Sequence, residues 1–315
     1  MGRIALVFAG QGAQAVGMGQ DLYEASPAAR RVFNEAEAVR PGVRVLCFEG
    51  PKENLNITAN TQPCLYTVDM ACVAALEESL GYFAFTHMMS GAAGFSLGEV
   101  AAACQVGYMT LTQGFQFVCR RAEAMHRAGE ENPGVMFAIL KLNVAQIEDL
   151  AHCCGGVYPV NYNSPVQTVV ACSPDRADDL TKAVNEAGGK ALKLPVSGAF
   201  HSPLMDVASA ELTSIVAEMS FGEGLMPLYS NMTGMPYGDP QELLARQVNH
   251  PVQWTQTVEN MVADGFDTFI EIGPGQTLSK LIGQINGDVR TLSVRDCASL
   301  NQTVEYLGGM ESVDA

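Results

Sequence analysis

Runs of hydrophobic residues alternate with segments of helical periodicity along most of the chain. The run at residues 3–8 ends at Gly10, as a buried strand does when it enters a glycine turn. Residues 63–80 carry apolar positions over a length typical of a buried helix, residues 225–230 form a predicted strand, and the run at 268–272 again ends at a glycine. Strands that alternate with helices in this way predict an α/β architecture around a mostly parallel sheet.

Residues 130–197 follow a different pattern. The order of the predicted elements is βαββαβ, which is that of a ferredoxin-like domain. We therefore predict a small ferredoxin-like domain at 130–197, inserted into a larger α/β domain formed by residues 1–129 and 198–315. The small domain would contain strand 135–140, a helix from 143 to 153, strands 157–162 and 168–172, a helix from 174 to 188, and strand 191–196. Asn143 with Gln146 resembles a capping box at the start of the first helix, and Ser173 with Pro174 resembles an N-cap followed by proline in the first turn of the second.

Composition and charge exclude several classes of protein. Of the 315 residues, 48% are hydrophobic and 17% are charged, which indicates a packed core rather than disorder. We find no run of apolar residues long enough for a membrane span and expect no contact with a membrane. The net charge of −16 argues against binding to nucleic acid. Nine cysteines without a C-x-x-C pair indicate reduced thiols in the cytoplasm and no metal site.

The segment Gly94-Phe95-Ser96-Leu97-Gly98 fits the pattern G-x-S-x-G. In this motif a serine stands on a tight strand-to-helix turn that exposes its Oγ, and larger residues in place of the glycines would crowd the turn. The N-terminus of the following helix offers free N–H groups and a positive dipole to a developing negative charge. Because the pattern also arises by chance, the competing interpretation is a buried serine in a tight turn.

A nucleophilic serine needs a base, and the chain offers five histidines. His201 differs from the others because it follows the last strand of the predicted small domain, and sites are common where domains meet. Arg120 and Arg121 lie in a predicted helix at 111–127. Both could be solvated on its surface, or one could point inward and bind a carboxylate through two N–H groups.

The segment that follows the first strand, residues 10–15, fits the dinucleotide pattern G-x-G-x-x-A. Gly17 and Gly19 come directly after it, so no helix starts where a pyrophosphate would need one, and the lysine of a Walker loop is absent. We therefore interpret the segment as a glycine turn that presents a backbone N–H to an oxyanion.

Together these motifs resemble those of the malonyl-CoA:acyl carrier protein transacylase family of bacterial fatty-acid synthesis, which is related to polyketide acyltransferase domains. The resemblance spans about residues 3–300 and implies an α/β-hydrolase-like large domain with a ferredoxin-like insert. The motifs that carry it are Phe8-Ala9-Gly10-Gln11-Gly12-Ala13-Gln14, Gly94-Phe95-Ser96-Leu97-Gly98-Glu99, Arg121, Val160-Asn161-Tyr162-Asn163-Ser164-Pro165, Ala199-Phe200-His201-Ser202, Asn249-His250-Pro251-Val252-Gln253-Trp254 and Glu271-Ile272-Gly273-Pro274-Gly275.

The resemblance implies a role for the principal residues of these motifs. Ser96 would attack the malonyl thioester, and His201 would take the proton of its hydroxyl. The backbone N–H groups of Gln11 and Leu97 would form the oxyanion hole. Arg121 would pair with the malonyl carboxylate, which is costly to desolvate without a cation.

Further positions complete the implied site. Gln247 would orient the histidine through its main chain, in place of a triad acid. Phe200 would narrow the space beside the malonyl α-carbon and favour unsubstituted malonyl, and Asn163 would contribute to substrate binding. Phe95 stands where many family members have histidine. A basic lip for the acyl carrier protein would consist of Arg120, Lys190, Lys193 and Lys280.

The implied activity is that of an S-malonyltransferase with a ping-pong mechanism, in which a malonyl-Ser96 intermediate meets the phosphopantetheine thiol of an acyl carrier protein. Beyond coenzyme A as a substrate carrier, the resemblance implies no cofactor. One alternative is a transacylase of other acyl specificity in a polyketide pathway. Another is a serine hydrolase or thioesterase, whose acid would be Asp175, Asp178 or Asp179. A binding module without an activated serine is the non-enzymatic alternative.

Overall fold

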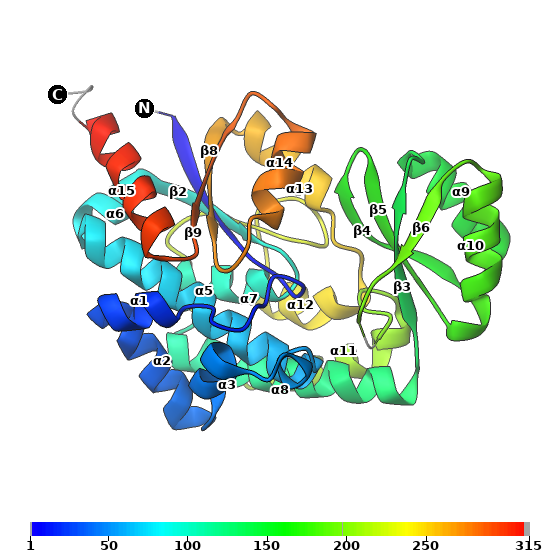
Figure 1. Cartoon of the computed structure of the whole chain (residues 1–315), viewed down its shortest axis with the longest axis horizontal. Coiled ribbons are helices and arrows are strands. Elements are labelled where there is room, and N and C mark those ends of the chain that lie inside the picture. Colours follow the sequence, from blue (N-terminus) through cyan, green and yellow to red (C-terminus); the bar gives the residue numbers. More distant parts are fainter. Residues whose placement is uncertain (1, 197, 312–315) are drawn as a thin grey trace.

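A five-stranded sheet of parallel strands lies at the centre of the structure, a computed structural model that describes residues 2–196 and 198–311 (Figure 1). All four strand pairings in it are parallel, so the mostly parallel sheet predicted from the sequence is confirmed. The spatial order is β7-β2-β1-β8-β9, with β1 (Arg3–Phe8), β2 (Met89–Gly94), β7 (Leu228–Tyr229), β8 (Phe266–Ile272) and β9 (Arg290–Val294). Of the strand predicted at 225–230, only the two residues of β7 pair in the sheet.

Helices cover both faces of this sheet, because successive side chains of each strand point to opposite sides. Ile4, Leu6 and Phe8 of β1 join one buried cluster, while Ala5 and Val7 join another. The first cluster includes α2 (Pro27–Val39), α5 (Thr58–Leu80), α7 (Leu97–Gln105), α8 (Leu111–Glu131), α11 (Asp206–Ala217) and α12 (Pro240–Arg246). The second includes α13 (Trp254–Ala263) and α14 (Thr277–Ile285).

Helix α5 runs through the middle of the first cluster and begins five residues before the start predicted at residue 63. Pro63 lacks an N–H, which leaves the carbonyl of Ala59 one turn earlier without its helical partner. Nη1 of Arg40 donates to that carbonyl at 2.8 Å, so the proline is accommodated inside the helix. No helix within residues 2–196 and 198–311 has the length and apolar character to cross a membrane. The remaining helices are α1 (Gln20–Ala25), α3 (Val43–Glu49), α4 (Lys52–Leu55), α6 (Tyr82–Met88) and α15 (Cys297–Glu311).

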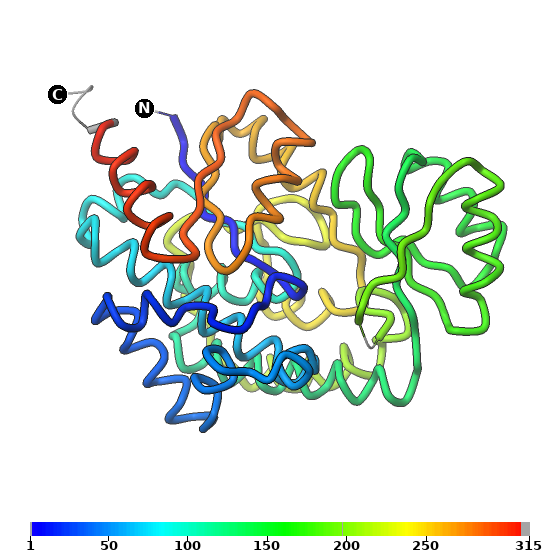
Figure 2. The backbone as a smooth tube through the Cα atoms, viewed as in Figure 1, coloured from blue at the N-terminus to red at the C-terminus, as the bar shows by residue number. Residues whose placement is uncertain are grey.

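A separate antiparallel sheet forms the other lobe of the backbone trace, seen on the right of Figure 2. Its elements follow the predicted order βαββαβ: β3 (Val135–Leu140), α9 (Val144–Cys154), β4 (Val157–Ser164), β5 (Gln167–Cys172), α10 (Ala177–Glu186) and β6 (Lys190–Lys193). The strands lie side by side as β4-β5-β3-β6. The boundary expected at residue 197 falls outside the described residues.

Of the two N-caps predicted for the helices of this lobe, one is confirmed and the other is wrong in part. Asn143 and Gln146 form the predicted capping box at the start of α9, with reciprocal bonds between side chain and backbone. Ser173 was expected to begin the second helix with Pro174 in its first turn. That expectation is wrong in part, since a 3₁₀ turn at Pro174–Arg176 comes first and the Ser173 side chain does not cap it. Proline suits the tighter turn because it has no N–H to satisfy.

The two faces of the antiparallel sheet belong to different cores. Phe137 and Ile139 of β3 pack with α9 and α10 in a cluster of their own. Met136 and Ala138 point to the other side and join the large cluster that contains the parallel sheet. Because side chains alternate along β3, one face of this strand packs against α9 and α10 and the other packs against the rest of the chain.

Asp69 on α5 is fully buried, and neither of its carboxyl oxygens has a hydrogen-bond partner among the described residues. Burial, with a further contribution from the charge of Glu271, raises its pKa well above the usual value. The folded chain therefore holds a proton that the unfolded chain releases, so this carboxyl makes the free energy of unfolding fall as pH rises above the unfolded pKa.

We expect Asp69→Ser to stabilise the protein increasingly as pH rises, because it removes the buried carboxyl whose ionisation is costly. A serine hydroxyl can donate to the helical carbonyl one turn before it, so it does not remain unpaired. The gain in Tm over wild type should grow by roughly 2–4 °C for each 1 kcal/mol that ionisation costs. Thermal unfolding at about pH 6 and pH 8 measures it. A Tm difference that is the same at both pH values would contradict the prediction.

Candidate active site

Ser96 stands between the end of β2 and the start of α7, with the positive φ of 52° that a sharp strand-to-helix turn imposes. A Cβ on Gly94 would lie 2.0 Å from the carbonyl carbon of Gly98, and one on Gly98 would lie 2.1 Å from the carbonyl oxygen of Phe8. Side chains cannot fit at either position. The reason given for the two glycines of the motif is therefore confirmed.

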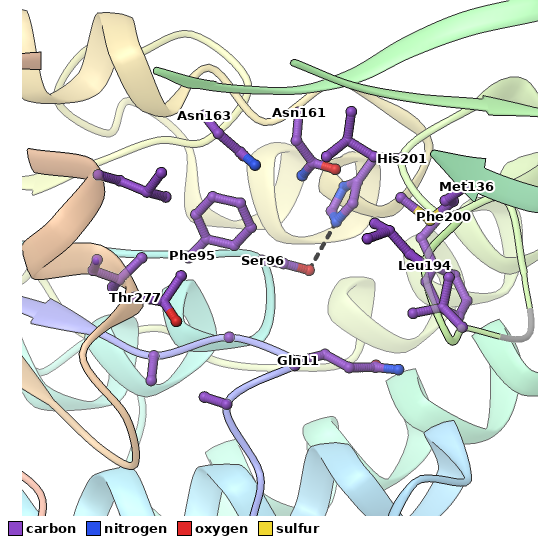
Figure 3. A pocket seen from close by; sticks show the side chains of 18 of the residues that line it. Gln11, Phe95, Ser96, Met136, Asn161, Asn163, Leu194, Phe200, His201 and Thr277 are labelled. Carbon is purple, nitrogen blue, oxygen red and sulfur yellow. Dashed lines mark hydrogen bonds between the residues drawn. The ribbon is translucent and has the colours of Figure 1, made fainter. Parts of the chain in front are cut away.

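His201, 105 residues later in the chain, faces Ser96 directly: its Nε2 lies 2.8 Å from Ser96 Oγ (Figure 3). Its Nδ1 lies 3.0 Å from the carbonyl oxygen of Gln247 and 3.2 Å from that of His250. Because carbonyls only accept, Nδ1 carries the hydrogen and Nε2 is left to accept the proton of the serine hydroxyl. The main chain of Gln247 thus occupies the place of a triad acid.

The protonation of His201 follows from its surroundings. Burial, and after it the positive charge of Arg121, lower its pKa to about 4. The imidazole is therefore neutral around pH 7, which is the form that a base needs. Its backbone also has a positive φ of 63°, held by a hydrogen bond from its N–H to the carbonyl of Val248 at 2.9 Å.

Arg121 on α8 is completely buried and points at the serine. Its Nη2 donates to Ser96 Oγ at 3.2 Å and to Gln247 Oε1 at 2.7 Å, and its Nη1 donates to Gln62 Oε1 at 2.5 Å. Burial lowers its pKa to about 10, so it stays charged at neutral pH. Within the described part of the chain no carboxylate forms an ion pair with it. A buried cation held by neutral oxygens is prepared for an anionic ligand.

The cavity in front of Ser96 has a volume of about 220 Å³ and lies where the two sheets meet. The glycine turn after β1 supplies Gln11 on one side, and Phe200 adjoins His201 on another (Figure 3). The antiparallel lobe contributes Asn163, whose Oδ1 has no hydrogen-bond partner among the described residues. The cavity is smaller than the usual pocket for a drug-sized ligand, which suits a short acyl group. Its other walls are Phe95, Met125, Met136, Asn161, Val169, Leu194, Val196, Thr277, Leu278 and Leu281, with residues 9–13 and Glu271.

The structure thus brings together most of the residues singled out in the sequence. Ser96, His201, Gln11, Phe200 and Asn163 line one cavity. Arg121 and Gln247 reach it through hydrogen bonds to Ser96. Leu97 is buried at the first position of α7, where an N–H has no partner inside its helix.

Other predicted positions lie away from the cavity walls. The basic residues Arg120, Lys190, Lys193 and Lys280 are exposed on α8, β6 and α14. The aspartates weighed as a triad acid are exposed, Asp175 in the 3₁₀ turn before α10 and Asp178 and Asp179 in the first turn of α10. Nδ1 of the histidine faces carbonyls instead. In the described residues no group of three acidic, histidine or cysteine side chains is arranged to hold a metal ion.

A buried polar layer lies beneath Ser96 and was not predicted from the sequence. Asn231 Oδ1 accepts the backbone N–H of Ser96 at 2.7 Å, and its Nδ2 donates to the carbonyl of Gly94 at 2.5 Å. Glu99 accepts from the N–H of Asn231 at 3.1 Å and from the hydroxyl of Tyr237 at 2.6 Å. Glu99 is the one charged residue in the otherwise apolar helix after the motif, and that signal could have marked it.

The family model described as the acyl transferase domain matches residues 5–300. The malonyl CoA-acyl carrier protein transacylase of Bacillus subtilis is 34% identical over 98% of both chains. The chain belongs to this transacylase family.

Solved structures of the family agree. The transacylase of Clostridium perfringens superposes with a TM-score of 0.92 at 34% identity and covers 99% of each chain. A malonyl-transacylase in complex with its type II polyketide synthase acyl-carrier protein superposes with a TM-score of 0.91 at 33% identity, over 96% of this transacylase and 99% of that one.

The pKa of His201 leads to a test. A neutral, serine-directed phosphonate should label Ser96 at a rate that rises with pH around 4 and then stays level through neutral pH. In Arg121→Ala the midpoint should move upward, because the charge that lowers the pKa is removed and water enters the cavity. Labelling rates across pH, followed by intact-protein mass, measure both profiles. A midpoint that stays in place or moves down would contradict this account of the histidine.

Proposed function

We propose that this protein transfers the malonyl group of malonyl-CoA to the phosphopantetheine thiol of an acyl carrier protein through a malonyl-Ser96 intermediate. The observation that carries the proposal is Arg121, a buried cation that forms no ion pair with a carboxylate of the described residues and whose Nη2 lies 3.2 Å from Ser96 Oγ. An acyl group that brings its own carboxylate would supply the missing charge, and a neutral acyl group would not.

In the first half-reaction, Ser96 Oγ attacks the thioester carbon while His201 Nε2 takes the hydroxyl proton. The C–S bond then breaks, and the same proton passes to the departing coenzyme A sulfur. In the second half-reaction, His201 takes the proton of the phosphopantetheine thiol, and the sulfur attacks the acyl carbon. The C–O bond to Ser96 breaks, and the proton returns to its Oγ.

The surrounding groups act on binding and on the charge that develops. The N–H groups of Gln11 and Leu97 would stabilise the oxyanion, and the positive end of α7 adds to their effect. Phe200 and Asn163 would contact the acyl group, with Phe200 disfavouring a substituent on its α-carbon. Because Arg121, the N–H groups and the histidine supply the charges that the reaction needs, we propose no cofactor beyond the thioester substrates.

The proposal extends to the fold and its surroundings. We propose an α/β-hydrolase-like catalytic domain from residues 1–129 and 198–315 and a ferredoxin-like insert at 130–197, supported by the strand order β4-β5-β3-β6 of the insert. We place the protein in the cytoplasm, since all nine cysteines are free thiols.

A serine hydrolase or thioesterase is the second candidate, and the site disfavours it. Such an enzyme would have an acid on Nδ1 of the histidine, where this site has the carbonyls of Gln247 and His250. A buried arginine beside the nucleophile also has no role in cleavage of a neutral ester. Transfer of another carboxylated acyl group, as in a polyketide pathway, uses the same chemistry.

Intact-protein mass after mixing with malonyl-CoA or acetyl-CoA tests the proposal. Wild type should gain a malonyl group and Ser96→Ala should gain none. Arg121→Ala should lose the preference for malonyl over acetyl by roughly tenfold or more, since a hydrogen-bonded charge is removed. An unacylated wild type, or a malonyl adduct on Ser96→Ala, would refute it.

For the carrier protein we propose a basic lip made of Arg120, Lys190, Lys193 and Lys280. With a net charge of −16, the whole molecule repels an acidic partner, so local positive charge must guide docking. Lys193 directly precedes Leu194 of the cavity wall, and Lys280 adjoins Leu281.

The double variant Lys193→Glu and Lys280→Glu should raise the KM for the carrier protein several-fold and leave acylation by malonyl-CoA unchanged. Steady-state transfer and single-turnover acylation separate the two effects, and Lys182→Glu on the outer helix α10 serves as a matched control. If the double variant keeps the wild-type KM, these lysines do not form the lip.

A further inference from the structure

Glu99 is the carboxylate nearest to Arg121 in the buried layer beneath the site, and it reaches the guanidinium through a single amide. Its Oε2 accepts from Nε2 of Gln247, and Oε1 of Gln247 accepts from Arg121 Nη2 at 2.7 Å. Gln247 Nε2 also donates to the carbonyl oxygen of Ser96 at 2.8 Å. Glu99 and Gln247 are both buried, so water does not compete for these bonds.

Acceptors lie on one side of the Gln247 amide and a donor lies on the other. An ionised carboxylate only accepts, so Glu99, together with the carbonyl of Ser96, holds the NH₂ end of the amide toward itself. The oxygen of the same amide then has to face Arg121, which only donates. The other oxygen of Glu99 is occupied by the N–H of Asn231 and the hydroxyl of Tyr237, so the carboxylate itself cannot turn away.

We propose that Glu99 is a positioning residue that holds the NH₂ end of the Gln247 amide and so fixes Arg121 for the carboxylate of the acyl group. The inference rests on the proposed function and deepens it, because it assigns part of the acyl selectivity to a residue that does not touch the substrate. Asn231 and Gln247 hold the turn at Ser96, while Glu99, with the carbonyl of Ser96, keeps the oxygen of the amide toward the guanidinium.

The ionisation of Glu99 makes the arrangement of Glu99, Gln247 and Arg121 depend on pH. Burial raises its pKa to about 7, against the bonds from Tyr237, Gln247 and Asn231 and the charge of Arg121, which lower it. The titratable groups that face it are Arg121 and Tyr237. Below pH 7 a proton on Oε2 would turn this oxygen into a donor opposite the NH₂ group of Gln247, which displaces the amide and weakens its bond to Arg121.

Glu99→Gln imitates that protonated state with little change in volume. Its amide oxygen should remain with the two donors at Asn231 and Tyr237, so its NH₂ group faces the NH₂ group of Gln247 and displaces that amide from Arg121. Single-turnover acylation by malonyl-CoA should slow, and the malonyl-to-acetyl rate ratio should fall roughly tenfold or more. Labelling of Ser96 by a neutral phosphonate should stay within about threefold of wild type, because the turn at Ser96 keeps Asn231.

Several outcomes would overturn the inference. A malonyl-to-acetyl ratio equal to that of wild type would do so, and so would malonyl acylation, acetyl acylation and phosphonate labelling that all fall together, since that marks a merely structural role. The matched control is Glu77→Gln on α5, a half-buried carboxyl with a raised pKa outside the cavity wall, which should keep the wild-type ratio.

Wild-type protein provides a second measurement that does not depend on folding of the variant. Its malonyl-to-acetyl ratio should fall between about pH 8 and pH 6, although the malonyl carboxylate remains ionised there. A constant ratio over this range would refute the role of Glu99. Wild type that malonyl-CoA does not acylate would instead refute the proposed function, so the two failures are distinguishable.

Discussion

The buried positive charge of Arg121 is the constraint on which the rest of the site depends. A guanidinium removed from water needs acceptors, and here it has the oxygens of Gln62, Gln247 and Ser96. The same charge helps to keep His201 neutral. The proposed binding of a carboxylate, the charge of the histidine and the hydrogen bond on the serine hydroxyl are therefore coupled through one side chain.

Holding these groups together requires strained backbone at two places. Ser96 and His201 both have positive φ, which L residues adopt only when the surroundings enforce it. Asn231 binds both the N–H of Ser96 and the carbonyl of Gly94, and the carbonyl of Val248 fixes the N–H of His201. Because both supports come from the C-terminal part of the chain, the turn at Ser96 is held only after segments far apart in the sequence have packed.

Features that depend on side-chain spacing and on short motifs could be predicted from the sequence. The strand before Ser96, the helix after it and the capping box at Asn143 follow from side-chain spacing and short-range hydrogen bonds, and the structure has them. The two-residue β7 was overestimated because its pairing depends on β2, not on its own residues. The contact of Glu99 with Gln247 joins residues 148 positions apart, and nothing local marks such a pair.

The amide of Gln247 separates the carboxylate of Glu99 from the guanidinium of Arg121. Direct contact between the two charges and their complete separation would each have a cost. A carboxylate bound directly to the guanidinium would neutralise it in the resting protein and compete with the carboxylate of the substrate. Without any carboxylate nearby, the buried cation would cost more to form. The amide of Gln247 avoids both costs, because its NH₂ group binds Glu99 and its oxygen binds Arg121. One side of Arg121 stays free for an incoming anion. The proposed specificity for a carboxylated acyl group would then depend on a neutral residue placed between two charges.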